Sequence, residues 1–187
     1  MKGRRPEEYE GLVRTVLLML MLVSAYFIVR GGARFVSSPQ VETKRERPCV
    51  IIDAGHGGVD PGKVSVDGAL EKDINLAIAQ KLQRFLQQQD VDAVLTRQSD
   101  AGLYDENASN KKVQDMKNRV ALIEERQPVL TVSIHQNSYH EEYVHGAQVF
   151  YYANSTKSQE LAEMIQQVMA LELDKDNARK AKANDSY

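Results

Sequence analysis

Residues 50–58 (VIIDAGHGG) join an apolar run to a glycine-rich turn that carries a histidine. An uninterrupted run such as Val50, Ile51 and Ile52 is typical of a strand buried on both faces of a parallel sheet. The glycines around His56 allow the backbone to turn sharply and leave space for a bound group. The stretch therefore predicts a central strand that delivers His56 at its carboxyl end.

Strands and helices alternate along the chain after residue 48. We expect strands at 49–53, 91–96, 129–134 and 147–152, and helices at 72–88, 110–126 and 157–173, with a charged helix end at 174–182. Apolar stripes at helical spacing lie at Ile74, Ile78, Leu82 and Leu86, and at Leu161, Ile165, Val168 and Met169. This order predicts one α/β domain over residues 48–187, with a largely parallel or mixed sheet flanked by helices.

An N-terminal hydrophobic helix is expected to precede this domain. Residues 15–29 are uncharged and apolar, and basic residues lie before them. This pattern is typical of a signal peptide or a retained membrane anchor, although a buried core helix would show similar composition. We assign residues 1–30 to this segment and residues 31–47 to a linker. A signal or an anchor would place the domain outside the cytoplasm, and an anchor would hold it at the membrane.

Composition narrows the class of protein. The chain has 187 residues, of which 42% are hydrophobic and 27% charged, which fits one globular domain plus an extension. Residues 48–187 carry 15 basic and 21 acidic residues, so no nucleic-acid partner is expected. The single cysteine, Cys49, excludes an internal disulfide and a thiolate zinc cluster.

A second histidine, His135, directly follows the apolar strand predicted at 129–134. The carboxyl ends of parallel strands meet in the crevice where open α/β sheets place their sites, so His56 and His135 are expected to converge. A single histidine at a strand end is often only a hydrogen-bonded structural residue. Two of them at matching ends favour a metal site.

Glu71 supplies a third candidate ligand, because it begins the helix at 72–88. Its spacing from the apolar stripe predicts a carboxylate that faces the sheet, where an unpaired charge is costly and a cation would remove the cost. The alternatives are a first-turn acid that complements the helix dipole, or a partner of Lys72. Together, His56, Glu71 and His135 form a His₂Glu set, which holds Zn²⁺ with an open fourth position in hydrolytic enzymes.

Five stretches of the sequence carry a resemblance to a known family. They are IIDAGHGG (51–58), LEKDINLAIAQKL (70–82), LTR (95–97), NRVALI (118–123) and SIHQNS (133–138). These stretches resemble the zinc-dependent N-acetylmuramoyl-L-alanine amidases of the Amidase_3 type, and most closely their germination-specific, spore-cortex members. The resemblance implies a zinc ion on His56, Glu71 and His135. It also implies hydrolysis of the amide between the lactyl group of N-acetylmuramic acid and L-alanine in peptidoglycan, during cell-wall catabolism in sporulation and germination.

The resemblance also implies a general-base glutamate on a later strand, in a segment similar to V-E-x-G-F. No such segment occurs before Tyr187, so no catalytic residue is identified, and we expect an amidase domain that is incomplete at its C-terminus and largely inactive. Glu141 and Glu142 would have to reach the metal-bound water from a loop. The alternative is a non-catalytic, zinc-containing module that binds peptidoglycan or regulates a partner.

Two weaker predictions concern ligand binding. Arg97 and Asn137 are candidates for substrate binding, although a structural ion pair is an equal alternative for Arg97. Residues 57–63 also fit G-x-x-x-x-G-K, the opening of a phosphate-binding loop. Asp60 and Pro61 inside that motif, and Val64 in place of Ser or Thr after it, disfavour nucleotide binding.

Overall fold

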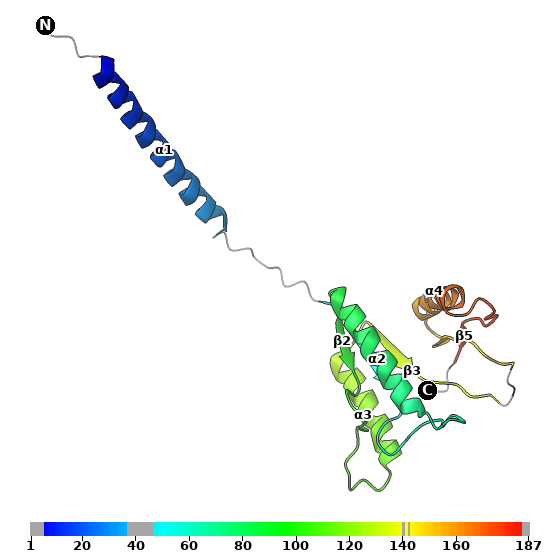
Figure 1. The fold of residues 1–187 in the computed structure, drawn as a ribbon. Coiled ribbons are helices and arrows are strands. Elements are labelled where there is room, and N and C mark those ends of the chain that lie inside the picture. The colour runs from blue at the N-terminus through cyan, green and yellow to red at the C-terminus, as the bar shows by residue number, and fades with distance from the viewer. Residues whose placement is uncertain (1–5, 37–46, 140, 142, 185–187) are drawn as a thin grey trace. The chain divides into compact units, whose positions relative to one another are not determined.

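The computed structural model describes residues 6–36, 47–139, 141 and 143–184. The chain divides into two units, residues 1–46 and residues 47–187. The first unit contains α1 (Pro6–Val36), which is blue in Figure 1. The second unit contains every other helix and strand that the structure describes.

Helix α1 is long and apolar enough to cross a membrane. Its window Val13–Arg30 has 18 residues and a mean hydropathy of 1.8, and none of the window is buried. The helix continues to Val36, so residues 31–36 of the predicted linker are helical, whereas residues 37–46 lie outside the described part of the chain.

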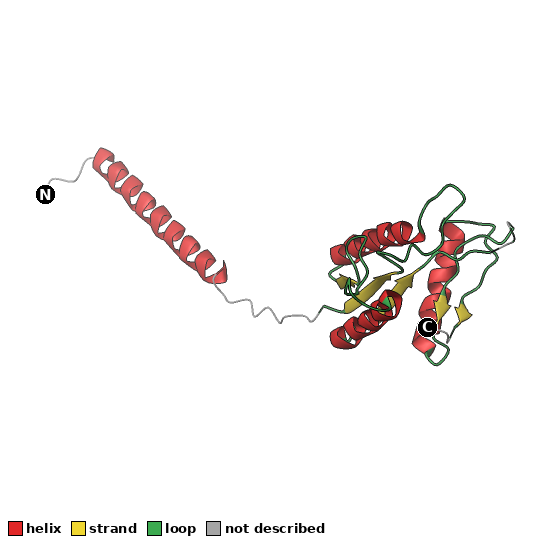
Figure 2. Ribbon diagram, turned by 90° about the horizontal axis from the view of Figure 1, so that it is seen from below, coloured by secondary structure: helices red, strands yellow, loops and turns green. Residues whose placement is uncertain are grey.

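The second unit is built on a parallel sheet, as the alternating pattern predicts. Its strands are β1 (Cys49–Ala54), β2 (Asp92–Leu95) and β3 (Leu130–Ile134), in the order β2-β1-β3. The connections between them are α2 (Glu71–Gln88) and α3 (Lys111–Arg126). Figure 2 shows the strands of this sheet with helices on both of its faces. The run that decides the fold is therefore the central strand.

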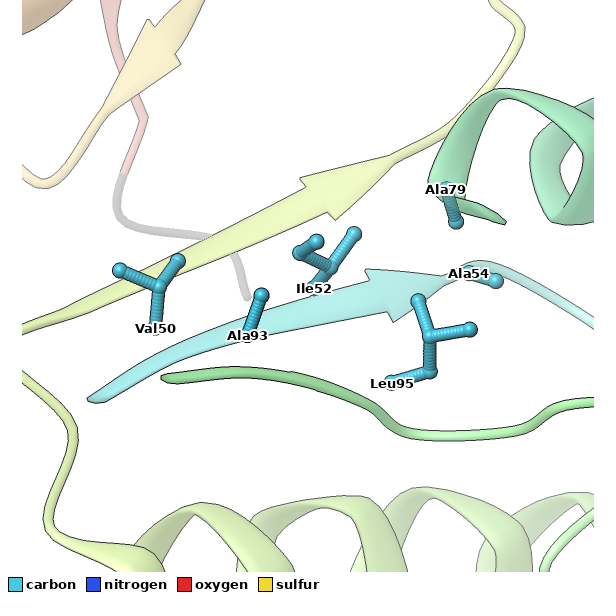
Figure 3. Packing of buried hydrophobic residues seen from close by; sticks show 6 residues of the cluster. All are labelled: Val50, Ile52, Ala54, Ala79, Ala93 and Leu95. Atoms are coloured by element: carbon cyan, nitrogen blue, oxygen red, sulfur yellow. The ribbon is translucent and has the colours of Figure 1, made fainter. Parts of the chain in front are cut away.

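The core lies between β1 and α2. Side chains alternate between the two faces of a strand, so one set from β1 and β2 points toward Ala79 of α2 (Figure 3). Ile51 is fully buried as well, but on the opposite side of β1, toward α3. The residues of the α2 side are Val50, Ile52, Ala54, Ala93 and Leu95, with Leu82 and Leu86 packed against them.

The buried line of α2 differs from the predicted stripe. Glu71, Asn75 and Ala79 are buried, whereas Ile74 and Ile78 are 40% and 42% exposed, so the prediction was wrong for these two isoleucines. Spacings of three and four residues describe two neighbouring stripes equally well. The structure selects the stripe in which Ala79 allows close approach and the two polar side chains find hydrogen-bond partners.

The start of α2 is capped by the preceding loop. The N-cap residue Leu70 offers no side-chain acceptor, and the N–H groups of Glu71 and Lys72 instead donate to the carbonyls of Lys63 and Pro61, at 2.9 and 3.2 Å. Free N–H groups at a helix start need such partners. The loop and the first turn of α2 therefore form one hydrogen-bonded structure.

The C-terminal part of the unit departs from the prediction. Instead of a long strand at 147–152 in the main sheet, β4 (Phe150–Tyr151) pairs with β5 (Lys182–Ala183) in a separate two-stranded sheet beside α4 (Thr156–Glu172). Residues 174–182 leave the helix and lead into β5, so the predicted helix end was wrong. The backbone carbonyls around β4 are hydrogen-bonded to the β5 segment: the N–H groups of Lys182 and Asn184 donate to the carbonyls of residues 149 and 151.

The apolar stripe predicted for α4 is also only partly buried. Ala162 and Gln166 are the buried residues of this helix, whereas Ile165 and Val168 are exposed. The amide of Gln166 bonds the N–H of Val149 and the carbonyl of residue 147, at 2.8 and 3.1 Å. The buried position of α4 that was expected to be apolar is therefore occupied by a polar side chain, which supplies hydrogen bonds to the backbone before β4.

An ion pair joins α3 to the central strand. Arg119 is almost fully buried, and its guanidinium lies 2.6 Å from Asp53 Oδ1 and 2.7 Å from Asp115 Oδ2. The Asp53 carboxylate also accepts from the hydroxyls of Thr96 and Ser133, at 2.8 and 2.7 Å. Burial raises the pKa of Asp53, but the charge of Arg119 and these hydrogen bonds lower it by more. The net pKa of Asp53 is therefore below its ordinary value.

Ile52→Ala is expected to lower the free energy of unfolding by about 2–5 kcal/mol, because it removes a fully buried side chain from the α2 side of the sheet. Urea unfolding of the chain in mild detergent measures the change. The matched control Ile78→Ala, on the half-exposed face of α2, should cost less than about 1 kcal/mol. Equal losses in the two variants would contradict the burial pattern.

Asp53→Asn is expected to cost about 1–3 kcal/mol at neutral pH, because Arg119 loses a charged partner. A carboxyl with a lowered folded-state pKa stabilises the fold above its unfolded pKa, and the contribution disappears as the pH falls through the folded value. The difference from wild type should therefore shrink below a pH of about 4. Urea unfolding at several pH values tests this, with exposed Glu125→Gln as control. A difference that does not change with pH would contradict the assignment.

Candidate metal centre

The ends of two neighbouring strands bring the predicted histidines together. Strands β1 and β3 end level, with Ala54 paired to Ile134, and the N–H of Gly55 continues the ladder by donating to the Ile134 carbonyl at 3.1 Å. His56 follows β1 and His135 follows β3. Their ring centroids lie 4.8 Å apart, with the rings nearly perpendicular.

The Glu71 carboxylate lies between these two rings. Its Oε1 is 3.2 Å from Nε2 of His56 and 3.2 Å from Nδ1 of His135. Four-coordinate zinc with bonds of about 2.1 Å has its ligand atoms roughly 3.4 Å apart. The two distances from Glu71 are therefore close to those in a zinc site, and the donor atoms of all three predicted ligands, which are of types that zinc binds, lie within 4.8 Å of one another.

Backbone N–H groups hold the Glu71 carboxylate in place. Lys63 donates to Oε2 at 2.9 Å and Gln136 donates to Oε1 at 2.8 Å, while the amide of Asn75 lies 3.4 Å from Oε1. Burial raises the pKa of Glu71, but these N–H donors and the neighbouring His56 lower it by more, so its net pKa lies below the ordinary value. Glu71 is therefore ionised at neutral pH, the form that a metal ligand requires.

The backbone at His56 has an uncommon conformation. Its φ angle is 64°, in the left-handed region that non-glycine residues seldom adopt, and Gly57 follows with a φ of 140°. Such a residue carries strain of about 1–3 kcal/mol that the surrounding structure must offset. The guanidinium of Arg119 donates to the His56 carbonyl at 2.7 Å and contributes to this.

The ring of His56 is also held from the side away from Glu71. Its Nδ1 lies 3.0 Å from Oδ2 of Asp60, which leaves Nε2 toward Glu71. Burial raises the pKa of Asp60, but the hydrogen bond with His56, a backbone N–H and Lys112 lower it to about 2. Asp60 is therefore an anion throughout the neutral range.

Two glycines provide the space that the group needs. A Cβ on Gly55 would lie 2.3–2.7 Å from ring atoms of His135. A Cβ on Gly62, whose φ is +68°, would lie 2.6 Å from His56 Cδ2 and 2.8 Å from Glu71 Oε2. Any side chain at these positions would displace the candidate ligands, so Gly55 of the 50–58 motif and Gly62 of the following loop both leave room for the site.

A pocket of about 200 Å³ opens beside the two histidines. Its carboxylates belong to Asp53, Asp60 and Asp115, and each lies against a basic group: Arg119 for Asp53 and Asp115, and Lys112 for Asp60. The remaining side chains are mixed polar and apolar. They include Val59, Tyr104, Met116 and Ser133.

The two predicted substrate-binding residues lie elsewhere. Arg97 is buried and its guanidinium donates to backbone carbonyls, including those of Ala54 and Lys72 at 2.9 and 2.7 Å, which favours a structural role, although through carbonyls rather than the expected ion pair. Asn137 is exposed, and neither residue lines the pocket. Glu141 is exposed, and Glu142 lies outside the described residues.

The structure contradicts a phosphate-binding loop at residues 57–63. Such a loop leads directly into a helix, but α2 begins only at Glu71. The N–H of Lys63 donates to the Glu71 carboxylate rather than facing an open anion site. Asp60 and Gln136, which contact the candidate ligands, could not be found from the sequence, because no spacing rule links a side chain or an N–H group to a side chain that a turn brings near.

Comparison with known proteins identifies the family. A family model for N-acetylmuramoyl-L-alanine amidase (Amidase_3) matches residues 50–187. The chain is 36% identical over 136 residues to the germination-specific N-acetylmuramoyl-L-alanine amidase of Bacillus subtilis and 30% identical over 131 residues to the amidase AmiA of Escherichia coli. These matches cover 71% and 69% of the chain but 56% and 41% of the relatives, so the chain spans about half the length of these curated relatives.

Solved structures agree with this result and confirm the predicted α/β fold. The CwlD amidase from Clostridioides difficile, in complex with the GerS lipoprotein, matches with a TM-score of 0.73 and 37% identity, over 75% of this chain and 74% of that one. An N-acetylmuramoyl-L-alanine amidase from Clostridium difficile 630 matches with a TM-score of 0.61 and 30% identity, over 74% of this chain and 70% of that one. The chain belongs to the N-acetylmuramoyl-L-alanine amidase family.

Proposed function

We propose that this protein is a zinc-dependent amidase that cleaves the bond between the lactyl group of N-acetylmuramic acid and L-alanine in peptidoglycan. The observation that carries the proposal is the convergence of His56, Glu71 and His135 beside an open pocket. The family match supports the reaction. The identity to a germination-specific amidase supports a substrate in the spore cortex.

Some residues of the site would hold the metal, and others line the pocket that would admit the substrate. Zinc in such a site polarises a carbonyl and lowers the pKa of bound water. Glu71 would supply the negative charge that holds the cation, and its two backbone N–H donors restrain its rotation. The pocket beside the histidines would admit the muramoyl peptide.

A proton acceptor for the attacking water is not evident among the described pocket residues. Asp53, Asp60 and Asp115 are all engaged with basic groups, which makes each of them a poor base. We therefore expect slow turnover from this chain. The same observation supports a second candidate function, a zinc-containing module that binds peptidoglycan or regulates a partner without cleaving it.

We further propose that the protein acts outside the cytoplasm. Peptidoglycan lies there, and the apolar window of α1 would serve as a signal or as a membrane anchor. At a rise of 1.5 Å per residue, the 18 residues of the window span about 27 Å, close to the hydrocarbon thickness of a bilayer. A retained helix would keep the domain close to the cell wall it acts on.

The purified chain is expected to retain about one zinc ion after dialysis against metal-free buffer, and His135→Ala should lose it, because two ligands hold zinc poorly. Elemental analysis measures the metal. The matched control is His145→Ala, which removes an exposed histidine that pairs with Asp174. A folded wild-type chain that binds no zinc would overturn both candidate functions.

The same samples separate the amidase from the binding module. New amino termini of L-alanine, released from purified peptidoglycan by the zinc-loaded chain and absent with His135→Ala, would support the amidase. Retention on peptidoglycan without new amino termini would support the binding module and overturn the amidase reading for this chain.

Gly55→Ala is expected to abolish zinc retention, because the added methyl group would occupy the position of the His135 ring. Gly68→Ala is the control: it lies in the loop before α2, also has a positive φ of +86°, and has open space around its Cβ position. It should lower stability through backbone strain but keep the metal. Normal zinc retention by Gly55→Ala would show that His135 is not a ligand in this position.

A further inference from the structure

We infer that Asp60 is a positioning residue that fixes the ring nitrogen with which His56 faces the metal. The inference rests on the proposed zinc function and extends it to a residue outside the ligand set. Asp60 lies in the turn that follows His56, and its Oδ2 is 3.0 Å from Nδ1 of that ring. Asp60 would act through His56 without touching the metal.

The backbone places Asp60 independently of its side chain. Gly57 and Asp60 exchange two backbone hydrogen bonds, with the N–H of each donating to the carbonyl of the other at 3.0 and 3.1 Å. This short antiparallel bridge directs the Asp60 carboxylate back toward the ring that precedes the turn. The positive φ angles of His56, Gly57 and Gly58 make so tight a turn possible.

Further contacts restrict the carboxylate itself. Its Oδ1 accepts from the N–H of Gly62 at 3.3 Å, and its Oδ2 lies 3.3 Å from the ammonium group of Lys112 on α3. The side chain is only 27% exposed. A carboxylate held at both oxygens presents a fixed acceptor to His56.

A fixed acceptor on one nitrogen selects the tautomer of the ring. Neutral imidazole carries one N–H, and a carboxylate beside Nδ1 favours the form in which Nδ1 donates and Nε2 has the free lone pair. In His56 this is the nitrogen that faces Glu71. Carboxylates that accept from the outer nitrogen of a metal-bound histidine also orient the ring and raise its basicity.

The second histidine shows why this selection matters. His135 faces Glu71 Oε1 with Nδ1, whereas His56 faces the same oxygen with Nε2. The two rings therefore require opposite tautomers at one centre. The carboxylate at Nδ1 of His56 supplies the difference for that ring.

The experiment compares Asp60→Asn and Asp60→Ala with the wild-type full-length chain. Asp67→Asn and Asp67→Ala are matched controls, because Asp67 lies in the same loop, is exposed, and bonds Ser65 and Ala69 rather than a ligand. Zinc affinity is measured by competition with a chromogenic chelator. We expect about 10–100-fold weaker binding for Asp60→Ala, a smaller loss for Asp60→Asn, which keeps an oxygen acceptor, and no change for the controls.

A spectroscopic measurement on the protein saturated with zinc separates positioning from a general effect on folding, because without zinc Glu71 is a second acceptor, 3.2 Å from Nε2 of His56. Long-range ¹H–¹⁵N correlation spectra of histidine-labelled protein report the Nδ1–H proton of His56, which the hydrogen bond to Asp60 would shift downfield and protect from exchange with water. The wild type and both Asp67 variants should show this downfield proton, and Asp60→Ala should move it upfield and broaden it. If Asp60→Ala fails to fold, Asp60→Asn decides the question through the same affinity and spectra.

The outcomes distinguish this inference from the function on which it rests. A folded wild-type chain without zinc affinity overturns both. Zinc bound by the wild type and with equal affinity by the Asp60 variants, or an unchanged Nδ1–H signal in Asp60→Ala, overturns the role of Asp60 alone. Weaker binding together with the change in the Nδ1–H signal supports it.

Discussion

The structure around the strand ends depends on the buried carboxylate of Glu71. This one group accepts hydrogen bonds from the loop before α2, from α2 itself and from the residue after His135, and it contacts both histidines. A buried charge is tolerated only where such partners compensate for the lost water. The requirement to satisfy this carboxylate therefore fixes the position of the segment after β3 relative to α2 and the loop before it, although 65 residues separate Glu71 from Gln136.

The motifs that the chain shares with the amidase family contain two kinds of residue: candidate metal ligands, and residues that hydrogen-bond the backbone. His56, Glu71 and His135 converge, whereas Arg97 and Arg119 donate to backbone carbonyls at the end of β1. An arginine fork can satisfy several carbonyls at once, which suits a place where the ladder of the sheet ends and a strained turn begins. A motif residue with a charged side chain thus need not face the substrate.

Much of the fold and the candidate ligands could be predicted because the local signals agree with the tertiary structure. An apolar run such as Val50–Ile52 permits few alternatives, and strands of one parallel sheet necessarily end at the same edge. The choice between the Ile74 and Asn75 faces of α2 could not be predicted, because it depends on how closely Ala79 approaches β1. Nor could the pairing of β4 with β5, since a two-residue strand has no periodicity of its own.

The preformed arrangement of the ligands has a thermodynamic consequence. Their donor atoms already lie within 4.8 Å of one another, so an ion entering the site would not have to gather them. The glycine turn loses its conformational entropy when the chain folds, before any ion binds. A bound ion would then stabilise the folded state by mass action. Metal binding and the folding of the loop before α2 would thus be thermodynamically linked. A higher concentration of free metal would lower the fraction of molecules in which that loop is unfolded.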